Sequence, residues 1–149
     1  MPRYFRRLAE GVFDQADLAL RTEELARFVG TAAERYGLDR SGIVAVGFSN
    51  GANIAGSLLL RRPGLLAGAV LFRAMLPFEP ERPVVLPATP VWLSAGRHDP
   101  TVPRENIERL ARLLRDAGAR VTLEWQDAGH QLTPEDVDSA TRWLAALPA

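Results

Sequence analysis

The hydrophobic residues of this chain recur with two alternating periods, one typical of helices and one typical of buried strands. Between Asp14 and Tyr36 apolar residues return every three or four positions, and Gly37 follows where a helix would end. The uninterrupted apolar run Ile43 to Val46 then predicts a short strand that is buried on both faces. The chain therefore opens with a long amphipathic helix followed by a buried strand.

The same alternation continues along the rest of the chain. A proline-rich stretch between residues 77 and 90 is expected to run over the surface as a loop. The last helix has a clear start, because Thr133 supplies a capping hydroxyl and Pro134 occupies the first helical position. The pattern predicts further strands at residues 67–72, 90–95 and 120–125, and helices at residues 50–60, 104–117 and from 134 onward.

Strands that alternate with helices predict an α/β fold, a three-layer sandwich built on a mostly parallel sheet. With 149 residues, of which 47% are hydrophobic, the chain has the size and the apolar content of one domain, so we expect a single domain over residues 1–149. Ligands of such folds bind outside the carboxyl ends of the strands. Candidate chemistry is therefore sought in the loops that follow the strands.

Composition and charge narrow the classes of partner. The 18 basic and 18 acidic residues balance, which argues against a nucleic-acid partner and favours a neutral substrate. The absence of cysteine excludes a thiolate nucleophile, a disulfide and a cysteine-based zinc site. No apolar run approaches the roughly 20 residues that span a bilayer, and no signal core begins the chain, so we expect a cytoplasmic protein without a membrane span.

The segment Gly47-Phe48-Ser49-Asn50-Gly51 is the first candidate for chemistry. It directly follows a predicted strand and opens a predicted helix, which is the context of a nucleophile elbow. Glycines at its two ends permit the sharp turn that exposes the serine hydroxyl. The alternative is a glycine-rich turn in which Ser49 only caps the following helix. The strand and helix on either side favour Ser49 as a nucleophile.

A serine nucleophile requires a base, and the chain contains only two histidines, His98 and His130. His130 follows the last predicted strand, at the same edge of the sheet as Ser49, and is the expected base. Asp99 follows the preceding strand and is the expected acid, which gives the chain order Ser, Asp, His that α/β-hydrolases use. Asp127 is the competing acid, and His98 is interpreted as a loop residue.

Three segments together resemble the phospholipase/carboxylesterase branch of the α/β-hydrolases, whose relatives include acyl-protein thioesterases and dienelactone hydrolases. These segments are GFSNGAN, GRHDPTVP and AGHQLTPED, and the resemblance extends from about Arg3 to the end of the chain. It implies hydrolysis of carboxylic esters with small or medium acyl groups through an acyl-enzyme, without a metal or organic cofactor. A thioesterase or lysophospholipase with the same three residues is the alternative within enzymes.

The chain departs from the family at its front. Family members usually begin with further strands and a loop that supplies the second oxyanion-hole amide, about 50 to 60 residues that have no counterpart here. The backbone N–H of Asn50 remains as one oxyanion donor. The strand Ile43 to Val46 would then expose an apolar edge, so we expect a homodimer that covers it. The cover is either the partner's equivalent edge or its N-terminal arm with Tyr4 and Phe5 as anchors, and the partner is a candidate source of the missing donor. The contrasting hypothesis is a non-catalytic association module.

Substrate contacts are expected beside the three catalytic candidates, although core or loop packing is an equally good interpretation of the same residues. Arg73 is a further candidate, since it could steer an anionic group, but an ion pair or a solvated side chain is the favoured interpretation. The apolar candidates for substrate binding are Phe48, Met75, Leu76 and Val102.

Overall fold

The computed structural model describes residues 3–148, and the ends of the predicted single domain, residues 1–2 and 149, lie outside the described residues. The strands of its main sheet are β3 (Val44–Phe48), β4 (Gly68–Phe72), β5 (Pro90–Gly96) and β6 (Arg120–Gln126). The helices are α1 (Gln15–Tyr36), α2 (Asn50–Arg61), α3 (Arg104–Asp116) and α4 (Pro134–Ala145), with a short 3₁₀ turn at Arg40–Gly42.

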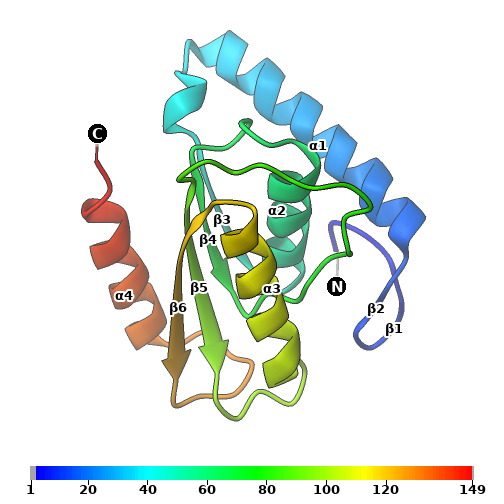
Figure 1. Cartoon of the computed structure of the whole chain (residues 1–149), viewed down its shortest axis with the longest axis vertical. Helices are drawn as coiled ribbons and strands as arrows, with labels where there is room; N and C mark the ends of the chain where they lie inside the picture. The colour runs from blue at the N-terminus through cyan, green and yellow to red at the C-terminus, as the bar shows by residue number, and fades with distance from the viewer. Residues whose placement is uncertain (1–2, 149) are drawn as a thin grey trace.

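The main sheet lies between two layers of helices (Figure 1). Its strands follow the order β3-β4-β5-β6, and every neighbouring pair is parallel. Helix α4 covers one face of the sheet, while α2 and α3 cover the other and α1 packs on the outside of α2. The predicted three-layer α/β sandwich with a mostly parallel sheet is therefore confirmed.

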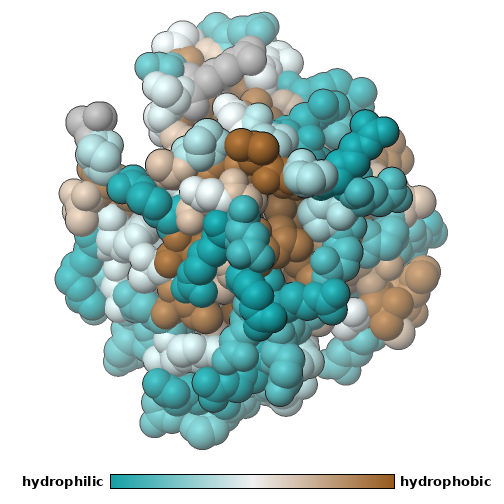
Figure 2. Space-filling model, viewed as in Figure 1, coloured by the Kyte–Doolittle hydropathy of each residue, from teal (hydrophilic) through white to brown (hydrophobic). Residues whose placement is uncertain are grey.

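The hydrophobic core is unequal on the two faces of the sheet. The larger part lies under α2 and α3 and includes fully buried leucines from both helices. The smaller part lies under α4, where Phe72 and Trp92 meet edge to face at 5.2 Å between ring centroids. On the side turned toward the viewer in Figure 2, the surface is mostly hydrophilic, with separate apolar patches between the polar side chains.

The helix ends follow from local chemistry. Asp14 precedes α1 and accepts a hydrogen bond from the backbone N–H of Asp17, while Gly37 ends the helix in the left-handed conformation at φ 60°. Thr133 and Asp136 form a reciprocal capping box at the start of α4. The predicted helix boundaries are accordingly confirmed to within one or two residues.

The prediction that the strand Ile43 to Val46 is buried on both faces was wrong. Strand β3 is the edge of the sheet, since within residues 3–148 only β4 pairs with it. Val46 is 63% exposed and Phe48 is 41% exposed. An apolar, β-branched sequence is typical of a central strand covered by helices on both faces. Val46 and Phe48 instead lie on the face of α4, and α4 packs mainly against β5.

The N-terminal segment contains a two-stranded antiparallel hairpin that the hydrophobic pattern did not predict. Its strands are β1 (Arg7–Ala9) and β2 (Val12–Phe13). Phe5 lies 5.1 Å from Phe13 in an edge-to-face contact, and only 2% of Phe5 is exposed. The expectation that Phe5 anchors a partner chain was therefore wrong, because its ring belongs to the core of its own chain.

Replacing Phe5 by alanine should destabilise the fold. The variant Phe5→Ala removes a fully buried ring, which typically costs about 3 to 5 kcal/mol of unfolding free energy, measurable by urea denaturation. Leu8→Ala is the matched control, because Leu8 is exposed and its loss should change stability by less than about 0.5 kcal/mol. A Phe5→Ala protein of unchanged stability would contradict this assignment of Phe5 to the core.

Candidate active site

Ser49 lies in the sharp turn between β3 and α2. Its backbone adopts φ 52° and ψ −113°, a conformation that is rare for any residue other than glycine. Two backbone hydrogen bonds hold this turn, from the Ser49 N–H to the carbonyl of Phe72 and from the Asn53 N–H to the carbonyl of Ser49, both at 2.9 Å. The turn thus joins the ends of two neighbouring strands to the start of a helix.

The glycine before the turn is required by close packing. A Cβ atom built on Gly47 would lie 2.5 Å from the carbonyl oxygen of Gly51, closer than real Cβ atoms come to backbone. The side chain of Ser49 makes no capping hydrogen bond to α2. The alternative interpretation of Ser49 as a helix cap was therefore wrong, and its hydroxyl is free to face another loop.

That hydroxyl meets a histidine and an aspartate from distant parts of the chain. The Oγ atom of Ser49 lies 2.9 Å from Nε2 of His130, and Nδ1 of His130 lies 2.9 Å from Oδ2 of Asp99. With its proton on Nδ1, the imidazole donates to the carboxylate and accepts from the serine hydroxyl. The structure thus brings together Ser49, Asp99 and His130, the three residues that the sequence analysis expected to act together. Each follows a strand at the carboxyl edge of the sheet.

The carboxylate of Asp99 is held in place by its own loop. Its second oxygen, Oδ1, accepts backbone N–H bonds from Thr101 at 2.7 Å and Val102 at 3.0 Å, and its side chain is 1% exposed. The competing acid Asp127 instead bonds to Nε2 of His98 at 2.7 Å, and both of those side chains are exposed. Asp99, rather than Asp127, is therefore the acid that reaches His130.

The oxyanion candidate Asn50 is the first residue of α2, so its backbone N–H lies in the turn of the helix where no intrahelical acceptor exists. Its side-chain Oδ1 accepts a hydrogen bond from the backbone N–H of Tyr4 at 2.8 Å. The Nδ2 group of Asn50 is buried and has no hydrogen-bond partner within residues 3–148. Buried donors normally have a hydrogen-bond partner, so the Asn50 amide is an exception beside the nucleophile turn.

A groove of about 450 Å³ begins at this turn and follows the open edge of β3. Its walls are the edge strand, the facing sides of α1 and α2 and the N-terminal residues Arg3 and Tyr4. The lining is largely apolar and includes Leu25, Val29 and Ile54. The groove therefore links the oxyanion candidate to the uncovered edge of the sheet.

The candidate substrate contacts divide into exposed and buried residues. Phe48 is partly exposed, and its ring centroid lies 5.5 Å from that of His130. Met75 and Val102 are buried in the main core, and Leu76 packs against that core half-buried. Of the four candidates, Phe48 is thus the one whose side chain both touches the imidazole and presents surface.

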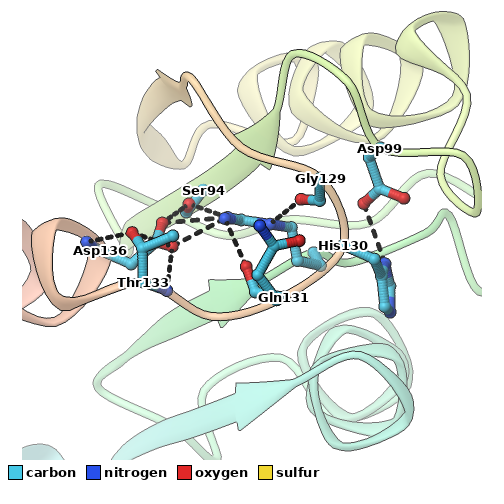
Figure 3. A network of polar contacts seen from close by, with 8 residues as sticks. Ser94, Asp99, Gly129, His130, Gln131, Thr133 and Asp136 are labelled. Carbon is cyan, nitrogen blue, oxygen red and sulfur yellow. Dashed lines mark hydrogen bonds and ion pairs between the residues drawn. The ribbon is translucent and has the colours of Figure 1, made fainter.

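Arg73 is buried in an ion pair, so of its two favoured interpretations the ion pair is confirmed and the solvated side chain was wrong. It follows β4, is 1% exposed, and its guanidinium pairs with the carboxylate of Asp136 at 2.7 Å (Figure 3). Burial by itself would raise the pKa of Asp136, but hydrogen bonds from Arg73, Ser94 and Thr133 outweigh burial and hold this pKa below its ordinary value. In the sequence, Thr133 to Asp136 indicate only the start of a helix, and nothing local to Asp136 indicates its distant partner.

Neither a cluster of metal-ligating side chains nor a membrane-spanning helix occurs within residues 3–148. Within residues 3–148, histidine, aspartate and glutamate side chains form no group of three or more that could hold a metal ion. In the same residues, every helix is too short or too polar to cross a membrane.

Comparison with known proteins points in the same direction as this geometry. A model of the phospholipase/carboxylesterase family matches residues 6–147. A protein named as a hydrolase, MhqD of Bacillus subtilis (strain 168), is 46% identical over 143 residues, which cover 96% of this chain and 72% of that protein.

Solved structures show the same relationship. The carboxylesterase of Bacillus cereus is 47% identical and superposes with a TM-score of 0.94, covering 97% of this chain and 68% of that one. The carboxylesterase of Mesorhizobium loti is 31% identical with a TM-score of 0.91, covering 97% of this chain and 69% of that one. Each relative is longer than this chain, whose fold is a shortened α/β-hydrolase fold. The chain belongs to the phospholipase/carboxylesterase family of hydrolases.

Proposed function

We propose that the protein is a serine esterase that hydrolyses carboxylic esters with short to medium acyl chains. Ser49 is the nucleophile, His130 the general base and Asp99 the residue that orients His130. The observation that carries this proposal is the chain of two 2.9 Å hydrogen bonds from serine through imidazole to a buried carboxylate. Membership of a hydrolase family supports it.

The reaction proceeds in two halves. The Ser49 oxygen attacks the ester carbonyl carbon while Nε2 of His130 takes the hydroxyl proton, and the carbonyl oxygen becomes an oxyanion. The tetrahedral intermediate collapses when the imidazolium returns that proton to the leaving alcohol, which leaves an acyl group on Ser49. Water then attacks the acyl carbonyl, again with His130 as base, and releases the acid and the free serine. Asp99 stabilises the imidazolium in both halves.

The oxyanion is stabilised by the start of α2. The backbone N–H of Asn50 lies at the positive end of that helix, where developing negative charge is favoured. One missing donor in such a site costs about 100-fold to 1,000-fold in kcat. The rate of this enzyme therefore depends on whether a second N–H group reaches the same position.

We propose that a second copy of the chain supplies this group by covering the edge of β3. Three observations support a homodimer at this place: the edge of β3 is unpaired within residues 3–148, Val46 and Tyr4 are exposed beside it, and Nδ2 of Asn50 lacks an acceptor. Edge strands with exposed apolar side chains readily pair with another chain. The groove along the edge provides the surface that the second copy would occupy.

Phe48 contributes the apolar contact to the acyl group. Its partly exposed ring lies against His130, which places it within reach of any group bound to Ser49. Met75, Leu76 and Val102, which lie in or against the main core, are the further candidates for an apolar wall. An apolar wall of this kind favours a short aliphatic chain over a charged one.

Removal of the nucleophile should abolish turnover. With p-nitrophenyl acetate, butyrate and octanoate as substrates, Ser49→Ala should lower kcat by about 10⁴-fold to 10⁶-fold, because the acyl-enzyme cannot form. Ser41→Ala, at an exposed serine outside the site, should retain wild-type activity. If folded wild type and Ser49→Ala are equally inactive, the association module is the better account. Faster turnover of matched thioesters than of esters would favour the thioesterase alternative.

The two candidate acids give opposite expectations. Asp99→Asn should lower kcat by about 10⁴-fold, because an amide cannot hold the imidazole in the required tautomer or stabilise its cation. Asp127→Asn is the matched control and should change kcat by less than about fivefold, since an exposed ion pair contributes at most about 1 kcal/mol. A large loss of kcat in Asp127→Asn with little change in Asp99→Asn would instead identify Asp127 as the acid.

The dimer can be tested through its edge strand. Val46→Lys should convert a dimer into a monomer in size-exclusion chromatography at micromolar concentration, because it places a charge on the exposed edge. If the partner supplies an oxyanion donor, kcat should fall by about 100-fold or more in the same variant. Val85→Lys, at an exposed valine in the proline-rich loop, is the control and should change neither the elution volume nor kcat. A wild-type protein that elutes as a monomer would exclude this dimer.

A further inference from the structure

Arg73 is an arginine with an unusual position and backbone. It follows β4 directly, its side chain is fully buried, and its φ of 55° lies in the left-handed region that non-glycine residues rarely adopt. Its backbone N–H donates to the carbonyl of Ser94 at 2.9 Å, which fixes the turn on the neighbouring strand. From this turn the guanidinium reaches the loop that precedes α4, where it contacts Gly129, Gln131 and Asp136.

The guanidinium holds the backbone on both sides of the general base. Its Nε–H donates to the carbonyl of Gly129 at 3.0 Å, and its Nη2 donates to the carbonyl of Gln131 at 3.0 Å. These are the residues immediately before and after His130. Because the guanidinium is planar and rigid, its two donors fix the distance and direction between the two carbonyls (Figure 3).

Asp136 holds the guanidinium in turn. Its two carboxylate oxygens accept from Nη1 at 2.9 Å and from Nη2 at 2.7 Å, a bidentate pair. The hydroxyl of Ser94 lies between them and bonds to both partners. Thr133 donates to Asp136 through its backbone N–H and its hydroxyl, each at 2.9 Å, so the pair is tied to the start of α4.

Stability alone does not account for this arrangement. Removing two charges from water offsets most of their attraction, and a buried ion pair can often be replaced by apolar residues without loss of stability. An apolar pair would fill the same space but could not donate to the carbonyls of Gly129 and Gln131. The specific contribution of Arg73 is therefore the geometry of the loop that carries His130.

We propose that Arg73, fixed by Asp136 and Ser94, is a positioning residue for the general base of the esterase. The proposal rests on the proposed function of His130. By holding the peptide groups on either side, Arg73 keeps Nε2 of His130 at the serine hydroxyl and Nδ1 at Asp99. A catalytic group displaced by about 1 Å can lose about 100-fold in rate, so this loop has to be rigid.

The decisive variant is Arg73→Lys. Lysine retains a positive charge opposite Asp136, but a single ammonium group cannot reproduce the planar fork that reaches both carbonyls. We expect kcat to fall by about 10-fold to 100-fold while KM stays within about twofold, because substrate binding does not involve this loop in the ground state. Ser94→Ala removes the hydroxyl's two hydrogen bonds, to Arg73 and to Asp136, and little volume. It should give a smaller loss of kcat in the same direction, and it replaces Arg73→Lys as the test if that variant does not fold.

The control separates positioning from stability. Leu114→Ala opens a cavity in the core under α3, away from the site, and should destabilise the protein at least as much as Arg73→Lys. Measured at a temperature where both variants are folded by near-ultraviolet circular dichroism, Leu114→Ala should keep the wild-type kcat. Equal losses of kcat in the two variants would overturn the proposal.

A spectroscopic readout tests the same idea without turnover. The proton between Nδ1 of His130 and Asp99 should give a downfield proton resonance in nuclear magnetic resonance spectra, and His98→Gln identifies it because the chain has only two histidines. In Arg73→Lys this resonance should broaden or disappear, while in Leu114→Ala it should remain. A wild-type resonance in Arg73→Lys would refute the positioning role. An inactive wild type with the expected change in resonance would instead refute the esterase function alone.

Discussion

Parallel pairing of the four strands is the constraint on which the rest of the molecule depends. Phe48 pairs with Phe72, and Phe72 pairs with Ser94, so neighbouring strands reach the carboxyl edge in step. The residues that follow the first two, Ser49 and Arg73, both adopt positive φ, and each backbone N–H donates to the last paired residue of the next strand. The sheet register therefore places the nucleophile candidate and the buried arginine at the carboxyl ends of neighbouring strands, in turns that share a positive φ and a backbone hydrogen bond to the next strand.

The ion pair between Arg73 and Asp136 is buried, and this burial decides how the pair responds to mutation and to pH. Loss of one member of a buried ion pair leaves an uncompensated charge and typically lowers the free energy of unfolding by about 3 to 5 kcal/mol. Replacement of Arg73 or Asp136 alone by an uncharged residue should therefore destabilise the fold. Because the pKa of Asp136 is lowered in the folded state, its contribution to stability is complete above its ordinary pKa and is lost as pH falls through the lowered value. Acid should therefore weaken the contacts between the sheet and the start of α4. The loop that precedes α4 carries His130, so its position should become less well fixed as well.

Local patterns predicted most of the elements and the three central residues, but not the contacts that join distant segments. Helix α1 was predictable because Asp14 and Gly37 mark its ends, and Ser49 because a glycine-bounded serine lies between a strand and a helix. The hairpin of β1 and β2 was missed, since strands of three and two residues are too short to show a period. The Arg73–Asp136 pair joins residues 63 positions apart, which no local window encodes. The exposed edge of β3 was expected from the family resemblance, whereas the local apolar pattern alone indicated a strand buried on both faces.

The two halves of the proposed catalytic machinery consequently depend on different surroundings. The serine, imidazole and carboxylate are held by loops whose partners all lie within this chain, from the Asp99 turn to the buried pair under α4. The oxyanion side lies at the exposed end of β3, where Asn50 is held by the N-terminal segment and retains an unpaired buried donor. In the proposed mechanism one chain organises proton transfer and supplies the Asn50 donor, whereas the second oxyanion donor comes from the chain that covers the edge strand. If a preparation keeps the hydrogen bond between His130 and Asp99 but turns over slowly, the missing contribution should lie at the edge of β3.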